Sequence, residues 1–457
     1  MIARVNFYII GFVFVCYCLF TLAHSHLFFK SQPTSLYHFL TDSFLAKRVD
    51  LLFTPPEELL ILKNPRDYLQ NRSIKFADGK RLHAKIHDAS LYHDKFYIYF
   101  SPVPVLVFYL PIKCLTGYYP SESVTILLFI TLSFMANLIL LNKVKEKYFQ
   151  KLDPFSIWLG SLLVGLGPNI IFLMRRPQIY EVAIAAALFF ISVGTVFLFN
   201  IFHKNKCGLD IFLCSLFLTL GVASRPHFVF AVAAVIIFIL YYLWTKRELT
   251  IRYATLLLLP FISIGILLAT YNYIRFDSIF EFGENYQLLG NLYGTVGKIY
   301  QSDLIQTNIV YNFYGYFLKP VMFHMKPPYV FFPIFENFEF LPKRVIEKSV
   351  GLLVSSPFII YLLGLAWFLK NKPRDFKNFL IGYAIIPSFI ILVLLILAAL
   401  GQRYITDFSV YLTLLAVVSW WLSQDCLPPS WLKLSDYLFI SLSIFSLYVS
   451  LLLGFGI

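Results

Sequence analysis

The chain has 457 residues, of which 59% are hydrophobic and only 14% are charged, and its mean hydropathy is +0.72. This composition excludes a soluble globular domain and is typical of a polytopic helical membrane protein. The net charge of +13 comes from Lys and Arg placed between hydrophobic segments, so it indicates membrane topology and membrane lipids as partners, with no nucleic acid.

The hydrophobic segments predict an all-α fold with about 11 transmembrane helices in a single transmembrane domain, residues 1–457. Most segments have ~17–23 residues, which is enough to cross about 30 Å of hydrocarbon. The first segment is too long for a cleaved signal and is followed by more spans, so we interpret it as a retained helix. In chain order, the expected spans are 6–24, 121–142, 154–173, 179–202, 209–223, 228–244, 253–273, 352–369, 379–400, 408–423 and 436–455.

Short basic loops fall on one side of these spans, the side of Arg4. Because cytoplasmic loops are enriched in Lys and Arg, the N-terminus is expected in the cytoplasm. Eleven spans then place the C-terminus and two long segments, 25–120 and 274–350, outside. The loop residues are Lys143, Lys145, Lys147, Lys151, Lys204, Lys206, Lys246, Arg247, Arg252, Lys370, Lys372, Arg374 and Lys377.

Both long external segments are expected to contain interfacial elements. Residues 36–53 have helical spacing of apolar positions, with Asp42 and Asp50 on the polar face. The apolar stretch 95–117 contains three prolines, which forbid one straight spanning helix and predict a helix lying along the outer interface. The second segment, 274–350, is rich in aromatic residues and Pro and is expected to be interfacial and partly helical.

Five arginines at the outer ends of spans break the positive-inside trend. An arginine in a tight external turn between apolar helices is costly to desolvate, so it is a functional hypothesis by default. Its planar fork matches phosphate oxygens and suits an anionic, lipid-linked headgroup. For Arg176 and Arg225 the alternative is ion pairing between helices, with Glu181 or Asp407 as the acid. For Arg403 the alternative is a pair with Asp407, four residues later on the same helix. The five are Arg175, Arg176, Arg225, Arg275 and Arg403.

Asp42 is the first candidate for a general base that takes a proton from an acceptor hydroxyl. Asp88 and Asp50 compete for this role, and a helix-end acid or an ion pair is the structural alternative for each. Further candidates for substrate binding lie in the same outer clusters: His87, Tyr97, Tyr180, Glu181, His227, Tyr404 and Asp407. The chain has neither HExxH nor DxD, so no cofactor is predicted, and a divalent metal has no supporting motif.

These clusters together resemble a family of bacterial polytopic proteins that is similar to the GT-C glycosyltransferase superfamily. That superfamily includes the protein O-mannosyltransferases and the aminoarabinose transferase of lipid A. The resemblance rests on HFLTDSFLAKRVDL (38–51), HDASLYHDKFYIYFSPVPVLVFYLP (87–111), RRPQIYE (175–181), ASRPHF (223–228), YNYIRFDSIFEFGENYQL (271–288) and RYITDF (403–408).

The resemblance implies a membrane glycosyltransferase that uses a polyprenyl-phosphate sugar as donor, in the bacterial inner membrane. It implies an acidic base just after the first span, where Asp42 is the matching residue, and interfacial helices in the first external segment. Many relatives have two adjacent acids there, whereas Ser43 follows Asp42 in this chain, which weakens the case for a bridging metal.

The sequence therefore predicts transfer of a sugar to an envelope lipid, glycan or protein on the extracytoplasmic side. A lipid or solute transporter is one alternative, and it would place polar residues at the bilayer midplane. A non-catalytic envelope assembly protein is another.

Overall fold

The computed structural model of the chain describes residues 2–25, 28–167, 169–203, 208–288, 309–324, 330–331, 349–397 and 400–455. Among them, eight helices are long and apolar enough to cross a membrane. The protein is therefore a mostly helical, multi-pass membrane protein, as the hydrophobic pattern predicts.

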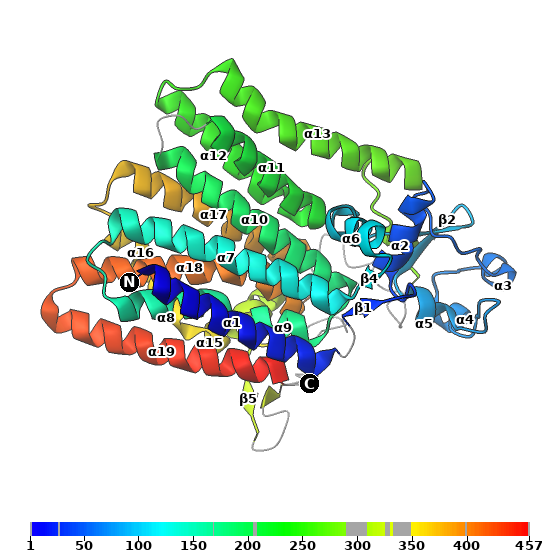
Figure 1. Cartoon of the computed structure of the whole chain (residues 1–457), viewed down its shortest axis with the longest axis horizontal. Helices are drawn as coiled ribbons and strands as arrows, with labels where there is room; N and C mark the ends of the chain where they lie inside the picture. Colours follow the sequence, from blue (N-terminus) through cyan, green and yellow to red (C-terminus); the bar gives the residue numbers. More distant parts are fainter. Residues whose placement is uncertain are drawn as a thin grey trace.

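The long helices run side by side in one bundle (Figure 1). Helix α10 lies at its centre and packs against α7, α11, α17 and α18. The bundle helices are α1 (Ile2–His24), α7 (Glu122–Tyr148), α8 (Pro154–Leu166), α9 (Ile170–Arg175), α10 (Ile179–His203), α11 (Gly208–Ser224), α12 (Val229–Thr245), α13 (Ile251–Phe276), α17 (Arg374–Leu397), α18 (Gln402–Cys426) and α19 (Pro429–Phe455).

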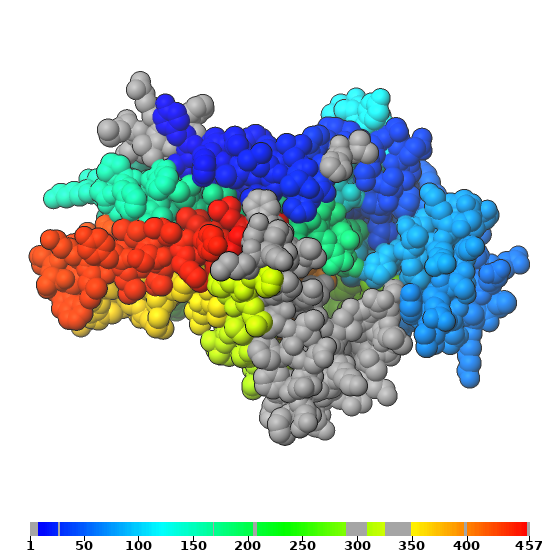
Figure 2. Space-filling view, turned by 90° about the horizontal axis from the view of Figure 1, so that it is seen from below, coloured from blue at the N-terminus to red at the C-terminus, as the bar shows by residue number. Residues whose placement is uncertain are grey.

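Residues 28–120, which we call the outer segment, form short elements at the end of the bundle away from the start of α1 (Figure 1). Figure 2 shows its light-blue residues gathered at that end. The elements are β1 (Phe29–Lys30), α2 (Leu36–Leu45), α3 (Glu57–Leu60), α4 (Tyr68–Asn71), α5 (Leu82–Ile86), β2 (Ala89–Tyr92), β3 (Lys95–Ile98), the π-helix η1 (Val105–Tyr109), α6 (Leu110–Thr116) and β4 (Tyr119–Pro120).

Two antiparallel pairings hold the outer segment together: β1 with β4, and β2 with β3. The first brings Lys30 opposite Tyr119 and so ties the exit of α1 to the entry of α7. The shorter elements that follow α11 are the 3-10 helices η2 (Pro226–Phe228) and η3 (Glu284–Tyr286), the π-helix η5 (Tyr314–Leu318), the paired strands β5 (Met322–Phe323) and β6 (Val330–Phe331), α15 (Leu352–Ser355), the 3-10 helix η6 (Pro357–Gly364) and α16 (Leu365–Phe368).

Four predicted elements differ from the structure. The span at 154–173 divides into α8 and α9, because the backbone at Asn169 is left-handed (φ 71°) and a Cβ at Gly167 would overlap the carbonyl oxygen of Leu163. The span at 352–369 consists of α15, η6 and α16 rather than one α-helix.

The helix predicted over 36–53 ends at Leu45, because the chain turns at Lys47 with φ 57°. The stretch 95–117 forms β3, η1 and α6 and is thus only partly helical. Much of the second external segment (289–308, 325–329 and 332–348) lies outside the described residues, as do Lys204 and Lys206.

Candidate functional site

A cavity of about 340 Å³ lies where the outer segment meets the ends of α10, α17 and α18. Its polar wall includes Arg225, His227 and Arg403, and its apolar wall includes Val393 and Leu394 of α17. Three tyrosines and one acid also line the cavity: Tyr99, Tyr180, Tyr404 and Glu284. We call it the arginine cavity.

Arg225 reaches this cavity from the junction of α11 and η2. Its backbone is extended (φ −140°, ψ 93°), as residues before proline prefer, and Pro226 opens the 3-10 turn. Its Nη2 donates to Oδ2 of Asp407 at 2.6 Å, and Nε2 of His227 lies 3.3 Å from the same oxygen. Asp407 is fully buried. The ion pair that the sequence offered as an alternative for Arg225 is therefore present.

Two polar atoms of this ion pair are not satisfied by it. Nε of Arg225 and Oδ1 of Asp407 are buried and have no hydrogen-bond partner within the described ranges. Buried polar atoms are usually satisfied, so an unsatisfied donor beside a cavity is consistent with a ligand that accepts hydrogen bonds. Asp407 thus orients the Arg225 guanidinium in the wall of the cavity.

Arg403 is held by aromatic rings. Its guanidinium carbon lies 4.1 Å from the ring centre of Tyr180 on α10 and 5.4 Å from that of Tyr404. The guanidinium of Arg225 also lies 5.4 Å from the Tyr404 ring. Cation–π contacts of this kind help to fix the position of an arginine. Two cationic groups from α18 and the α11–η2 junction thus face one cavity.

Asp88 lies in a left-handed turn between α5 and β2 (φ 65°), within electrostatic range of Arg403 and Tyr99, two lining residues of the arginine cavity. Burial raises the pKa of Asp88, opposed by His87, by a hydrogen bond from Gln287 and by the charges of Arg403 and Arg176. Nε2 of His87 is 3.6 Å from its Oδ2. Burial, and then the nearby Asp88, also raise the pKa of Tyr99, which lines the cavity.

Glu284 is a site residue that the sequence reasoning missed. It lines the arginine cavity, and burial together with Glu281 raises its pKa. Gly283 places it there with φ 102°, and a Cβ at that position would lie 2.8 Å from Oγ of Ser90. The EFGEN stretch at 281–285 contained the signal, since a glycine between two acids indicates a tight turn.

Asp42 lies elsewhere. It lines a second cavity of about 470 Å³ within the outer segment, which we call the outer cavity. Its Oδ1 accepts a 2.5 Å hydrogen bond from the hydroxyl of Tyr119. With 3.6 residues per turn, Asp42 is about 140° around α2 from Tyr37. Tyr37 lies within electrostatic range of Arg225.

The structure thus gathers only part of the predicted site. Arg225, His227, Arg403, Tyr180 and Tyr404 line one cavity, and Asp88 lies within electrostatic range of Arg403. Asp407 is buried behind the cavity wall, where it forms an ion pair with Arg225. Glu181 is buried next to Tyr180 in the first turn of α10. The sequence could not place Asp42 because the side of α2 that faces the arginines is set by tertiary contacts.

The other predicted residues do not line the arginine cavity. Buried Arg275 donates to the carbonyl oxygens of Ile98 and Tyr271 and stacks 3.9 Å from the Tyr271 ring. Tyr97 packs against Phe276, Arg175 lies over Phe172, Asp50 pairs with Arg48, and Arg176 is exposed.

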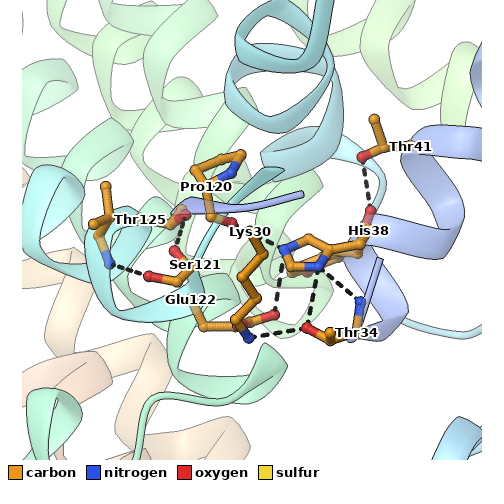
Figure 3. A network of polar contacts seen from close by, with 10 residues as sticks. Lys30, Thr34, His38, Thr41, Pro120, Ser121, Glu122 and Thr125 are labelled. Carbon is orange, nitrogen blue, oxygen red and sulfur yellow. Dashed lines mark hydrogen bonds and ion pairs between the residues drawn. The ribbon is translucent and has the colours of Figure 1, made fainter. Parts of the chain in front are cut away.

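A polar network fixes α2 against the start of α7 (Figure 3). Nε2 of buried His38 donates to the carbonyl of Pro120 at 2.9 Å, and its Nδ1 accepts from the backbone N–H of Thr34 at 3.1 Å. Glu122 lies 3.9 Å from Nε2, and Lys30 lies 3.8 Å from Glu122. Both ring nitrogens are thus used by a neutral imidazole.

We expect the outer segment to lose stability on acidification through His38. Burial lowers the pKa of His38, against the opposing effect of Glu122, so its contribution is present above the unfolded pKa and is lost as pH falls. Limited proteolysis of the segment should accelerate from about pH 7.5 to about pH 5. His38→Gln should reduce this pH dependence, and an unchanged dependence would contradict the assignment.

Within the residues that the structure describes, no group of three or more His, Cys, Asp or Glu side chains is arranged to hold a metal ion. Comparison with known proteins gives no match to a family model, to a curated protein or to a solved structure.

Proposed function

We propose that this protein is a membrane glycosyltransferase that moves a sugar from a polyprenyl-phosphate donor to an envelope acceptor outside the cytoplasm. The observation that supports it best is the arginine cavity, where Arg225 and Arg403 face an apolar wall formed by Val393 and Leu394. An anion joined to a hydrocarbon chain matches this combination of charge and apolar surface.

The arginines are proposed to bind the donor phosphate. Attack by an acceptor hydroxyl oxygen forms the new bond to the anomeric carbon, and the bond from that carbon to the phosphate oxygen breaks. The polyprenyl phosphate leaves with the electron pair and an added negative charge, which Arg225 and Arg403 would stabilise. A single displacement of this kind inverts the anomeric carbon.

Asp88 is the carboxylate that we assign as the general base, taking the proton of the acceptor hydroxyl. It lies within electrostatic range of Arg403 and of Tyr99, both of which line the cavity. The family resemblance points instead to Asp42, which lines the outer cavity. The two assignments predict opposite effects of substituting Asp42 and Asp88 on kcat.

The proposal includes a GT-C-like architecture of eleven spans in the bacterial inner membrane. Three shorter apolar segments, α1, α11 and η6–α16, would add to the eight long helices. In Figure 1 the α7–α8, α12–α13 and α18–α19 connections lie at the end where α1 begins. By the positive-inside rule, the basic residues of the first two connections support a cytoplasmic location for that end, and therefore an external location for the arginine cavity.

Donor turnover tests the proposed function. Full-length protein in liposomes, given polyprenyl-phosphate sugars and a lipid and glycan extract of bacterial envelopes, is expected to release polyprenyl phosphate. Movement of intact donor between leaflets, without cleavage, would support a transporter instead. Unchanged donor in both leaflets would contradict the proposal.

The pH dependence of turnover tests the proposed base. Asp88 must be ionised to accept a proton, so kcat/KM should rise as pH rises through its pKa. Since burial raises that pKa, the acidic limb should lie at higher pH than for an ordinary aspartate. A limb at the position of an unperturbed aspartate would contradict this role for Asp88.

A further inference from the structure

The outer cavity differs in charge from the arginine cavity. Its titratable lining residues are two acids, Asp42 and Asp78, and two bases, Lys80 and Lys85, so the wall has no net charge. Nζ of Lys85 donates to Asp78 at 2.8 Å. Because the charges compensate one another within the wall, a charged ligand gains little electrostatic attraction there. A neutral ligand with many hydroxyls can donate hydrogen bonds to the carboxylates and accept them from the ammonium groups.

The apolar part of the outer cavity is aromatic. Phe39 and Phe53 contact edge to face, with ring centres 4.7 Å apart. Nζ of Lys85 lies 4.3 Å from the Phe53 ring centre. A cavity that combines ring surfaces with donors and acceptors suits a ligand that has both C–H faces and hydroxyl groups.

Asp42 keeps acceptor capacity in this wall. The Tyr119 hydroxyl occupies Oδ1, and among the described residues no other side chain donates to this carboxylate. Burial and the adjacent Asp42 raise the pKa of Tyr119, so this tyrosine stays a donor. Oδ2 is therefore available to accept a hydrogen bond from a ligand.

We propose that the outer cavity binds a neutral carbohydrate through Asp42, Phe53 and Lys85. Its use as the docking site of the acceptor glycan rests on the transfer proposed above, whereas sugar binding itself does not. In that role Asp42 accepts a hydrogen bond from a sugar hydroxyl and positions the glycan, and no covalent step takes place at this carboxylate.

Ligand-observed saturation-transfer NMR on the full-length protein in nanodiscs tests the proposal. The probes are methyl α-mannoside, methyl β-glucoside and diacetylchitobiose, with inorganic phosphate as competitor. At least one sugar should receive saturation, and phosphate should not displace it. Absence of transfer to all three sugars, or displacement by phosphate, would overturn the proposal.

Variants locate the binding. Asp42→Ala should weaken sugar binding about tenfold, in the range for a lost hydrogen bond to a charged group. Gln32→Ala, at an exposed lining position, should weaken it without affecting the fold. Asp94→Asn is the matched control, since it removes one exposed charge of the same segment at a left-handed turn that asparagine tolerates. Equal affinity in wild type, Asp42→Ala and Gln32→Ala would place the binding elsewhere and overturn the assignment.

The two proposals fail separately. Release of polyprenyl phosphate without sugar binding would remove the outer-cavity site and leave glycosyl transfer standing. Sugar binding without donor cleavage would do the reverse.

Discussion

Replacing Asp88 with asparagine is expected to lower kcat for glycosyl transfer by about 10²–10⁴-fold, the usual contribution of a positioned general base. The amide keeps the shape of the side chain and can still accept from Gln287, but it cannot take the proton of the acceptor hydroxyl. The measurement is release of polyprenyl phosphate at saturating donor and acceptor, on protein whose thermal unfolding matches that of wild type.

Asp42→Asn is the matched control for this prediction. Asp42 lines the outer cavity and accepts from Tyr119, so its substitution is expected to raise KM for the acceptor while kcat stays within about tenfold, or 1.4 kcal/mol, of wild type. The reverse result, with kcat lost in Asp42→Asn and kept in Asp88→Asn, would restore Asp42 as the base.

The second large effect is expected at the ion pair beneath the arginine cavity. Asp407→Leu leaves Arg225 without the carboxylate that accepts its 2.6 Å hydrogen bond. Removing one partner of a buried ion pair costs about 3–5 kcal/mol of unfolding free energy. Thermal or denaturant unfolding of the purified protein in detergent measures this loss.

Replacing both partners separates stability from function. Arg225→Met with Asp407→Leu removes both buried charges at similar volume, so the double variant should be more stable than Asp407→Leu alone. It should still lose transfer by about 10²-fold or more, because one stabilising group for the leaving phosphate is gone. A double variant that transfers sugar at the wild-type rate would show that Arg225 does not hold the phosphate.

The membrane-spanning character of the chain could be predicted because it depends on local composition. Runs of apolar residues mark α7, α10 and α18 whatever their neighbours are. The break between α8 and α9 depends on Gly167 and Asn169, and a single glycine within an apolar run is a weak signal. The 3-10 conformation of η6 likewise has no period that a hydropathy pattern reveals.

The part of the site formed by residues at helix ends could be predicted from the sequence. Arg225 and Arg403 precede or begin helices that reach the same end of the bundle, so their convergence follows from the order of spans. The direction of the Asp42 side chain could not be predicted in this way. Helix α2 is short, and its rotation is fixed by the contact of His38 with Pro120, 82 residues later in the chain. Such long-range contacts are not visible in local sequence patterns.

Photo-crosslinking of the donor tests the central claim most directly. A polyprenyl-phosphate sugar with a diazirine on its first isoprene unit, bound to the full-length protein, should label peptides that contain Val393 and Leu394 of α17. The label should be lost in the double variant at Arg225 and Asp407. Labelling confined to the largely exposed helix α13, unchanged by that double variant, would contradict the account.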